Sequence, residues 1–192
     1  MCVRMHVLCL EGCHGSGKTS VIDYAQMQSH LTFDENYIDM PPSALHPQSL
    51  TCEQMWVASW FKRILQAHAD TENKGRVFFS DRSPFSAVLY AKNGSLLLPL
   101  IEHQIEELRE IGIHVETVYL QVEATELWRR IQARLQVQPD RTRYFEHERS
   151  WMDQTVQWYE AQSWTHTLDT THARPTDVFN TLKNLVAGKK IE

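Results

Sequence analysis

A phosphate-binding loop motif near the start of the chain constrains the fold more than any other feature. Residues 12–19 read Gly-Cys-His-Gly-Ser-Gly-Lys-Thr and match the pattern G-x-x-x-x-G-K-[ST]. The apolar run 7–10 precedes the motif, and residues 20–28 after it contain neither Gly nor Pro. This context predicts a strand, a tight loop and a helix, the arrangement in which the motif binds a polyphosphate. We therefore expect the chain to bind a nucleoside triphosphate.

The residues of this loop have distinct expected roles. Backbone N–H groups can surround the phosphates, and the positive end of the following helix adds to their effect. Lys18 is expected to reach the β- and γ-phosphates, and the Thr19 hydroxyl is expected to hold Mg²⁺. The candidate nucleotide-binding residues are Gly12, Cys13, His14, Gly15, Ser16, Gly17, Lys18, Thr19 and Ser20.

Size, charge and cysteine content exclude several classes of protein. The 192 residues, 42% of them hydrophobic and 22% charged, suit one soluble α/β domain. A net charge of −5 argues against a nucleic-acid polymer as partner, because such a partner needs a basic surface. We expect no membrane span, because the sequence has no run of about 18 apolar residues. We also expect no signal peptide, since the first predicted strand begins so early. Four cysteines without a C-x-x-C pair or zinc spacing fit an intracellular, cytoplasmic protein.

Apolar periodicity predicts the order of the remaining elements. Short apolar runs predict strands at residues 36–39, 76–79, 115–120 and 165–168. Apolar residues at helical spacing predict helices at residues 52–69, 99–111, 125–135, 144–162 and 175–187. The expected buried stripe of the first of these helices consists of Met55, Trp56, Trp60, Ile64 and Leu65. Strands that alternate with helices predict an α/β fold in three layers, a parallel sheet with helices on both faces.

Ligands of such sheets bind at the carboxyl ends of the strands. An acidic and a basic residue, Asp81 and Arg82, follow the predicted strand 76–79 at this end. Asp81 at this place can contribute to the Mg²⁺ shell, and Arg82 can orient an acceptor. The alternative is an ion pair that only supports the end of the strand, because such pairs also occur without function. We do not expect Cys13 to be a catalytic thiol, since no neighbouring residue supplies a base.

Three segments of the chain together resemble the nucleoside and nucleotide kinases, the group that contains deoxynucleoside kinases and thymidylate kinases. The segments are residues 11–19, the stretch Val-Phe-Phe-Ser-Asp-Arg-Ser-x-x-Ser at 77–86, and the pair Arg130 and Arg134. Deoxynucleoside kinases carry a similar Phe-Phe-(Glu/Asp)-Arg-Ser stretch, whereas the phosphate loop alone indicates only triphosphate binding. The resemblance extends from about residue 7 to residue 169.

The resemblance implies a P-loop kinase fold, in one domain over residues 1–192 with a mobile lid at about residues 130–145. In that family, an acid at the end of the second strand is the general base for the sugar 5′-hydroxyl. This acid corresponds to Glu35, with Asp34 as the alternative. A glutamine early in the next long helix pairs with the base of the nucleoside, and Gln54 is the matching residue.

The resemblance also assigns roles to the arginines. Arg82 would position the 5′ group, and lid arginines would close over ATP, which with Mg²⁺ is the expected cofactor pair. Arg141 and Arg143 are further lid candidates. The expected catalytic residues are Lys18, Glu35, Arg82 and Arg134. The expected lid contacts to ATP are Arg130 and Arg134, the expected substrate contacts are Glu35, Gln54, Asp81 and Arg82, and the expected metal ligands are Thr19 and Asp81.

Some residues depart from the family pattern. The acid of the Asp-Arg-Ser stretch is the one found in thymidylate kinases, and the lid lacks the usual acidic run after its arginines. The Glu-Pro pair that commonly follows the second strand is absent as well. The assignment of Glu35 therefore depends on its place in the chain rather than on a matching motif.

The charge pattern favours a neutral acceptor over a phosphorylated one. Residues 20–61 contain no Lys or Arg, whereas a monophosphate needs a cationic clamp. Residues 140–146 argue the other way, because they resemble the Arg-rich stretch after the lid of thymidylate kinases. We expect γ-phosphoryl transfer to the 5′-hydroxyl of a (deoxy)nucleoside, with a thymidylate kinase-like nucleoside monophosphate kinase as the alternative. A P-loop NTPase switch is favoured less, since no water-orienting motif is visible. A homodimer is compatible with the resemblance.

Overall fold

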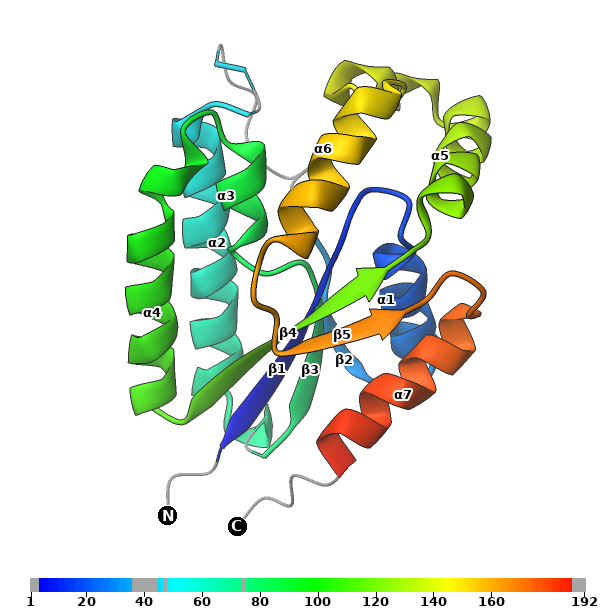
Figure 1. Cartoon of the computed structure of the whole chain (residues 1–192). Helices are drawn as coiled ribbons and strands as arrows, with labels where there is room; N and C mark the ends of the chain where they lie inside the picture. Colours follow the sequence, from blue (N-terminus) through cyan, green and yellow to red (C-terminus); the bar gives the residue numbers. More distant parts are fainter. Residues whose placement is uncertain (1–3, 36–44, 47, 74, 188–192) are drawn as a thin grey trace.

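A five-stranded parallel sheet forms the centre of the protein, with the strand order β2-β3-β1-β4-β5 (Figure 1). The computed structural model describes residues 4–35, 45–46, 48–73 and 75–187. The strands are β1 (Met5–Glu11), β2 (Leu31–Phe33), β3 (Val77–Asp81), β4 (Ile113–Gln121) and β5 (His166–Asp169). β1 is the central strand because its apolar run can be buried on both faces of the sheet.

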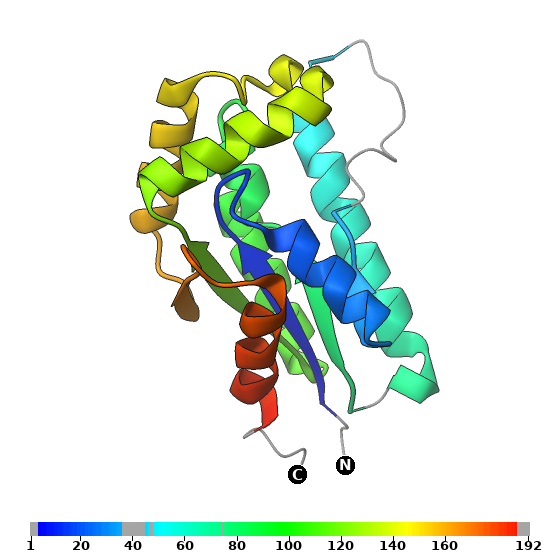
Figure 2. The ribbon, with the colours of Figure 1, turned by 90° about the vertical axis from the view of Figure 1, so that its right-hand side faces the viewer.

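Helices cover both faces of this sheet, which confirms the predicted three-layer α/β fold. The α-helices are α1 (Lys18–Met27), α2 (Leu50–Ala69), α3 (Ser86–Tyr90), α4 (Leu98–Glu110), α5 (Ala124–Val137), α6 (Arg149–Glu160) and α7 (Pro175–Ala187). Short 3-10 helices are η2 (Thr71–Asn73), η3 (Gly94–Leu96) and η4 (Pro139–Tyr144). Helices α1 and α7 lie on one face, α2, α3 and α4 lie on the other, and α5 and α6 extend beyond the carboxyl ends of the strands (Figures 1 and 2). Among the helices of the described ranges, none has the length and apolarity needed to cross a membrane.

Alternating residues of β1 supply two separate cores. Val7 and Cys9 point to the face of α2 and α4, whereas Leu8 and Leu10 point to the face of α1 and α7. The first core includes Trp56, Trp60, Ile64, Ile101 and Leu108, and the second includes Val21, Ile22, Phe79, Phe179 and Leu182. Because both cores pack on the same strand, the loop that follows β1 is fixed from both sides.

Several predicted details differ from the structure. The strand predicted at residues 36–39 lies outside the described residues, and the described β2 comes earlier in the chain. Met55 and Leu65 are both 46% exposed, because the buried stripe of α2 follows Trp56, Trp60 and Ile64 instead. The helix predicted from residue 144 begins only at Arg149, since Phe145 adopts a left-handed conformation with φ 60° after η4.

Phe179 lies at the aromatic centre of the second core, and its burial contributes to the stability of the protein. It is 1% exposed, and its ring packs on the rings of Tyr24, His30 and Phe79 at centroid distances of 5.7, 4.9 and 5.1 Å. Phe179→Ala should lower the free energy of unfolding by about 3–5 kcal/mol, because it leaves a cavity that the sheet cannot close. Urea denaturation measures this change. Met27→Ala is the control: its side chain is 72% exposed, so the expected change is within about 0.5 kcal/mol.

Candidate functional site

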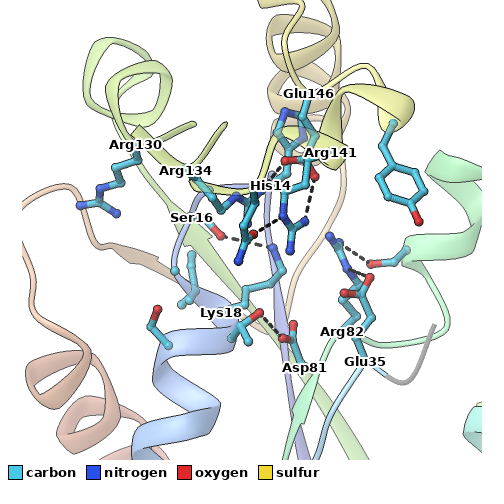
Figure 3. A pocket seen from close by; sticks show the side chains of 18 of the residues that line it. His14, Ser16, Lys18, Glu35, Asp81, Arg82, Arg130, Arg134, Arg141 and Glu146 are labelled. Carbon is cyan, nitrogen blue, oxygen red and sulfur yellow. Dashed lines mark hydrogen bonds and ion pairs between the residues drawn. The ribbon is translucent and has the colours of Figure 1, made fainter. Parts of the chain in front are cut away.

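A cavity of about 810 Å³ lies at the carboxyl ends of the strands (Figure 3). The phosphate loop, the ends of β2 and β3, and helices α2, α3, α5, η4 and α6 all contribute to its wall. The predicted site residues that line it are His14, Gly15, Ser16, Gly17, Lys18, Thr19, Ser20, Glu35, Asp81, Arg82, Arg130 and Arg134. Gly12, Cys13 and Gln54 are not among the lining residues. Most of the predicted site therefore converges on one place.

The phosphate loop holds its own lysine in the structure. The Lys18 ammonium donates hydrogen bonds to the carbonyl oxygens of Gly12 and Cys13, at 2.7 and 3.0 Å, and to Ser16 Oγ at 3.4 Å. Burial, and next the charge of Arg82, lower the pKa of Lys18 to about 8, although Asp81 and Glu35 act in the opposite direction. Lys18 is thus a buried cation that carbonyl groups stabilise only in part, and an anion in the loop would stabilise it further.

His14 and Cys13 are buried in the same loop but carry no charge. Burial, and then the positive charges of Arg134 and Lys18, lower the pKa of His14 to about 3, so the imidazole is neutral. Burial raises the pKa of the Cys13 thiol to about 12, more than Lys18 lowers it. A thiol of this kind is a poor nucleophile, in agreement with the expectation that Cys13 is not catalytic.

The Thr19 hydroxyl and the Asp81 carboxylate are in contact at the N-terminus of α1. Thr19 Oγ1 donates a hydrogen bond to Asp81 Oδ2 at 2.7 Å. Asp81 Oδ1 is buried and has no hydrogen-bond partner within the described part of the chain. Mg²⁺ prefers oxygen ligands, and a buried carboxylate oxygen with an unmet requirement beside a hydroxyl fits such an ion. These residues therefore suit the metal predicted for Thr19 and Asp81.

Arg82 connects Asp81 to the end of β2. Its Nε donates to Glu35 Oε1 at 2.8 Å, and its guanidinium carbon lies 4.9 Å from the centre of the Tyr90 ring. Burial alone would raise the pKa of Glu35, but the charges of Arg82 and Lys18 outweigh this effect and hold the pKa below its usual value. Glu35 is therefore an ionised carboxylate that faces the cavity.

Two of the arginines predicted for a lid share one carboxylate, whereas a third has other partners. Arg134 Nη2 and Arg141 Nη1 donate to the two oxygens of Glu146, at 2.5 and 3.2 Å. Arg130 instead donates to Glu126 Oε1 at 2.8 Å and to the Thr171 carbonyl oxygen at 2.7 Å. Figure 3 shows Arg130 directed away from Lys18, while Arg134 and Arg141 lie near His14. In the structure, the predicted pair Arg130 and Arg134 therefore lines different parts of the cavity wall.

The other half of the cavity contains residues that the sequence analysis did not select. Glu53 of α2 lines the wall in place of its neighbour Gln54, and Gln48 lies just before this helix. The aromatic residues of this wall are Trp56, Tyr90, Tyr144 and Trp151. The periodicity of α2 had indicated Trp56 only as core, and it is both a core residue and part of the wall. Glu53 is buried one helical turn before Trp56, on the same stripe of α2. The helical spacing of that stripe, extended by one turn, would have indicated Glu53.

Comparisons with known proteins identify the fold. No family model matches the sequence, and no curated protein matches it. Polyphosphate kinase 2 from Arthrobacter aurescens TC1 is similar in structure, with a TM-score of 0.60 and 17% identity over 99% of this chain and 70% of that one. The protein APE1195 is also similar, with a TM-score of 0.53 and 17% identity over 98% of this chain and 97% of that one. At this identity the likeness shows the fold alone, an α/β fold with a parallel sheet between layers of helices.

The lowered pKa of Lys18 predicts how stability depends on pH. The folded-state pKa of about 8 lies below the ordinary value of 10.5, so between these values the unfolded chain binds more protons than the folded chain. The free energy of unfolding of the wild type should therefore rise relative to Lys18→Met by about 2 kcal/mol from about pH 8 to about pH 10. Urea titrations of both proteins without nucleotide measure this difference. A difference that stays constant or falls would contradict the burial of a charged Lys18.

Proposed function

We propose that the protein transfers the γ-phosphoryl group of ATP to the 5′-hydroxyl of a (deoxy)nucleoside. One observation carries this proposal: a single cavity contains the phosphate loop with Lys18 and, beside it, the ionised carboxylate of Glu35 paired with Arg82. The fold shared with a polyphosphate kinase supports phosphoryl transfer as the class of reaction. The nucleoside acceptor is proposed from the residues that line the cavity and not from the likeness to polyphosphate kinase 2.

In the donor half, the loop is proposed to bind the phosphates of ATP. Lys18 would exchange the carbonyl oxygens of Gly12 and Cys13 for phosphate oxygens, which its ammonium neutralises more fully. Thr19 and Asp81 would hold Mg²⁺, which supplies positive charge to the phosphates. These assignments are supported by a loop whose Lys18 and Thr19 both line the cavity.

In the acceptor half, Glu35 is proposed as the general base. The 5′-hydroxyl oxygen forms the new bond to the γ-phosphorus, the bond from that phosphorus to the β–γ bridging oxygen breaks, and the hydroxyl proton passes to Glu35. Arg82 contacts Oε1 of Glu35, so Oε2 is the oxygen proposed to accept the proton. Arg82 fixes the carboxylate and at the same time places positive charge beside the transferred group.

The wall around Glu35 supports a nucleoside as acceptor. Trp56, Tyr90 and Trp151 offer ring faces or edges on which a base can pack, and the polar groups of Gln48 and Glu53 can bind its edge. Arg82 is already paired with Glu35, which limits the charge left for a phosphate dianion.

A nucleoside monophosphate is the second candidate acceptor, as in thymidylate kinases. Arg141 and Arg143 line the cavity from η4, and they could clamp its phosphate. We also propose that the chain works as one kinase domain over residues 1–192, with its lid at about residues 130–145. No nucleic-acid polymer or membrane has a part in this proposal.

An ADP-release screen tests the proposed function directly. The wild type is incubated with ATP, Mg²⁺ and each common nucleoside or nucleoside monophosphate in turn. We expect ADP to form rapidly only with a nucleoside, and Lys18→Ala to reduce this rate by about 10²–10⁴-fold through the lost charge. A monophosphate that is far better than any nucleoside would select the second candidate. ADP release without any acceptor would instead indicate an NTPase.

Glu35→Gln tests the general base. The amide retains the shape of the side chain and a hydrogen bond to the acceptor, but it cannot take up the proton. We expect kcat to fall by about 10²–10⁴-fold, with nucleoside affinity within a few-fold of wild type. Steady-state kinetics and calorimetric titration of the nucleoside separate the two effects. A fully active Glu35→Gln would rule out this mechanism.

Arg134→Ala tests the lid. Arg134 is bound to Glu146 in the structure and lines the cavity, so it can shift to the phosphates of ATP when the lid closes. We expect kcat/KM for ATP to fall by about 10–100-fold, the loss of one charge-assisted contact to the transferring group. Arg109→Ala on the surface of α4 is the control and should leave the kinetics unchanged, because Arg109 forms an ion pair with Glu106 and does not line the cavity. Unchanged kcat and KM in Arg134→Ala would show that Arg134 has no part in the reaction.

A further inference from the structure

A buried carboxylate that the proposed mechanism does not use lies at the end of β1. Glu11 directly precedes the phosphate loop, and its side chain is inaccessible to solvent. Its Oε1 accepts hydrogen bonds from the backbone N–H and the hydroxyl of Ser83, at 2.8 and 2.6 Å. Its Oε2 accepts from the hydroxyls of Ser86 and Tyr159, at 2.8 and 3.0 Å. All four hydrogen bonds use this side chain as an acceptor, so a donor group in its place would lose some of them.

This carboxylate determines the direction in which two hydroxyl protons point. Ser86 and Tyr159 each have one hydroxyl proton, and both protons are directed to Glu11. Their oxygen lone pairs are therefore free to accept from Arg82 Nη1, which lies 3.3 Å from Ser86 Oγ and 3.2 Å from the Tyr159 oxygen. If either proton turned round, a donor would face the donor of the guanidinium. Glu11 thus makes both hydroxyls acceptors for Arg82.

Arg82 needs this support because its backbone is strained. Its φ of 72° lies in the left-handed region, where a side chain with a Cβ is disfavoured. The conformation directs the guanidinium from the end of β3 into the cavity, between Glu35 and the ring of Tyr90. Contacts to the side chain have to offset this strain, and two of those contacts are the hydroxyls that Glu11 orients.

The same network connects three distant parts of the chain. Glu11 ends β1, Arg82 and Ser86 follow β3, and Tyr159 belongs to the last turn of α6. Tyr159 is itself fixed by stacking on Tyr119 of β4, with ring centroids 5.6 Å apart and planes 8° from parallel. The position of Arg82 therefore depends on the packing of β1, β4 and α6, which hold Glu11 and Tyr159 in place.

We infer that Glu11 is a positioning residue: by orienting the hydroxyls of Ser86 and Tyr159, it holds Arg82 in the geometry in which Arg82 binds Glu35 and faces the acceptor. The second part of this statement, the role of Arg82 toward the acceptor, rests on the proposed function. The first part is a property of the protein without any ligand. The two parts are therefore tested by different measurements.

Glu11→Gln is the central variant because it preserves size but replaces one acceptor oxygen with an NH₂ donor. If the NH₂ group faces Ser86 and Tyr159, their protons must turn away from residue 11, and at most one of them can turn to the other hydroxyl, 3.3 Å away. If it faces Ser83, it meets two donors. Tyr159→Phe is the second variant, since it removes one hydroxyl and retains the ring that stacks on Tyr119. Glu106→Gln, on the exposed side of α4, is the matched control because Glu106 forms an ion pair with Arg109 on the surface, away from the cavity.

Hydrogen exchange of the Arg82 Nε–H, measured by NMR on the protein without ligand, tests the positioning. In the wild type and in Glu106→Gln this proton is protected by the 2.8 Å hydrogen bond to Glu35. We expect exchange to be at least about tenfold faster in Glu11→Gln, and also faster in Tyr159→Phe. Rates within about twofold of wild type in a folded Glu11→Gln would overturn the inference. If Glu11→Gln does not fold, the rate in Tyr159→Phe decides in the same way.

Kinetics test the consequence for the reaction. We expect the acceptor-dependent kcat/KM of Glu11→Gln to fall at least about tenfold, while the Kd for ADP stays within about twofold of wild type. A general loss of structure would weaken both quantities, and that result would overturn a positioning role. Faster exchange with unchanged kcat/KM would overturn the second part, the role of Arg82 toward the acceptor. If the wild type itself phosphorylates no acceptor, the proposed function fails, whereas the exchange rates still decide whether Glu11 positions Arg82.

Discussion

The buried guanidinium of Arg82 is the interaction on which the geometry of the cavity depends. It is 8% exposed and contacts Glu35, Ser86, Tyr159 and the ring of Tyr90, groups from three separate parts of the chain. A buried cation is costly unless hydrogen bonds and an opposite charge surround it, so these elements must stay in register for the fold to tolerate it. The arginine therefore fixes the relative positions of Glu35, α3 and α6 around the cavity.

Positive charge gathers on the other side of the cavity without a matching number of anions. Lys18 is held by carbonyl oxygens, and Arg134 and Arg141 divide the single carboxylate of Glu146 between them. The cavity therefore favours a multiply charged anion, because such a ligand replaces weak partners with strong ones. The neutrality of His14 follows first from its burial and then from the same excess of positive charge, which repels a further proton.

The sequence predicted those parts of the molecule that depend on local pattern. Residues 12–19 form the phosphate loop between β1 and α1, and α7 has the predicted bounds 175–187, because apolar spacing and the ends of these elements are local signals. The convergence of Glu35 with Arg82 could be expected from the rule that ligands bind at the carboxyl ends of strands. The contact between Glu11 and Tyr159 could not be expected in this way, since the two residues are 148 positions apart in sequence and meet only through packing. Likewise, the choice of Glu53 over Gln54 depends on a rotation of α2 that periodicity fixes only to within a residue.

The strand order has a consequence for the chain during its synthesis. β1 is the first strand to be made, but its partners are β3, which ends at Asp81, and β4, which ends at Gln121. At roughly 5–20 residues per second, the ribosome needs on the order of 5–20 seconds after β1 to complete both neighbours. During that time the apolar run 7–10 has no sheet to join and two faces to cover. Holdase chaperones that bind short apolar segments would find their target in the nascent chain at this strand, and they would lose it as soon as β4 emerges.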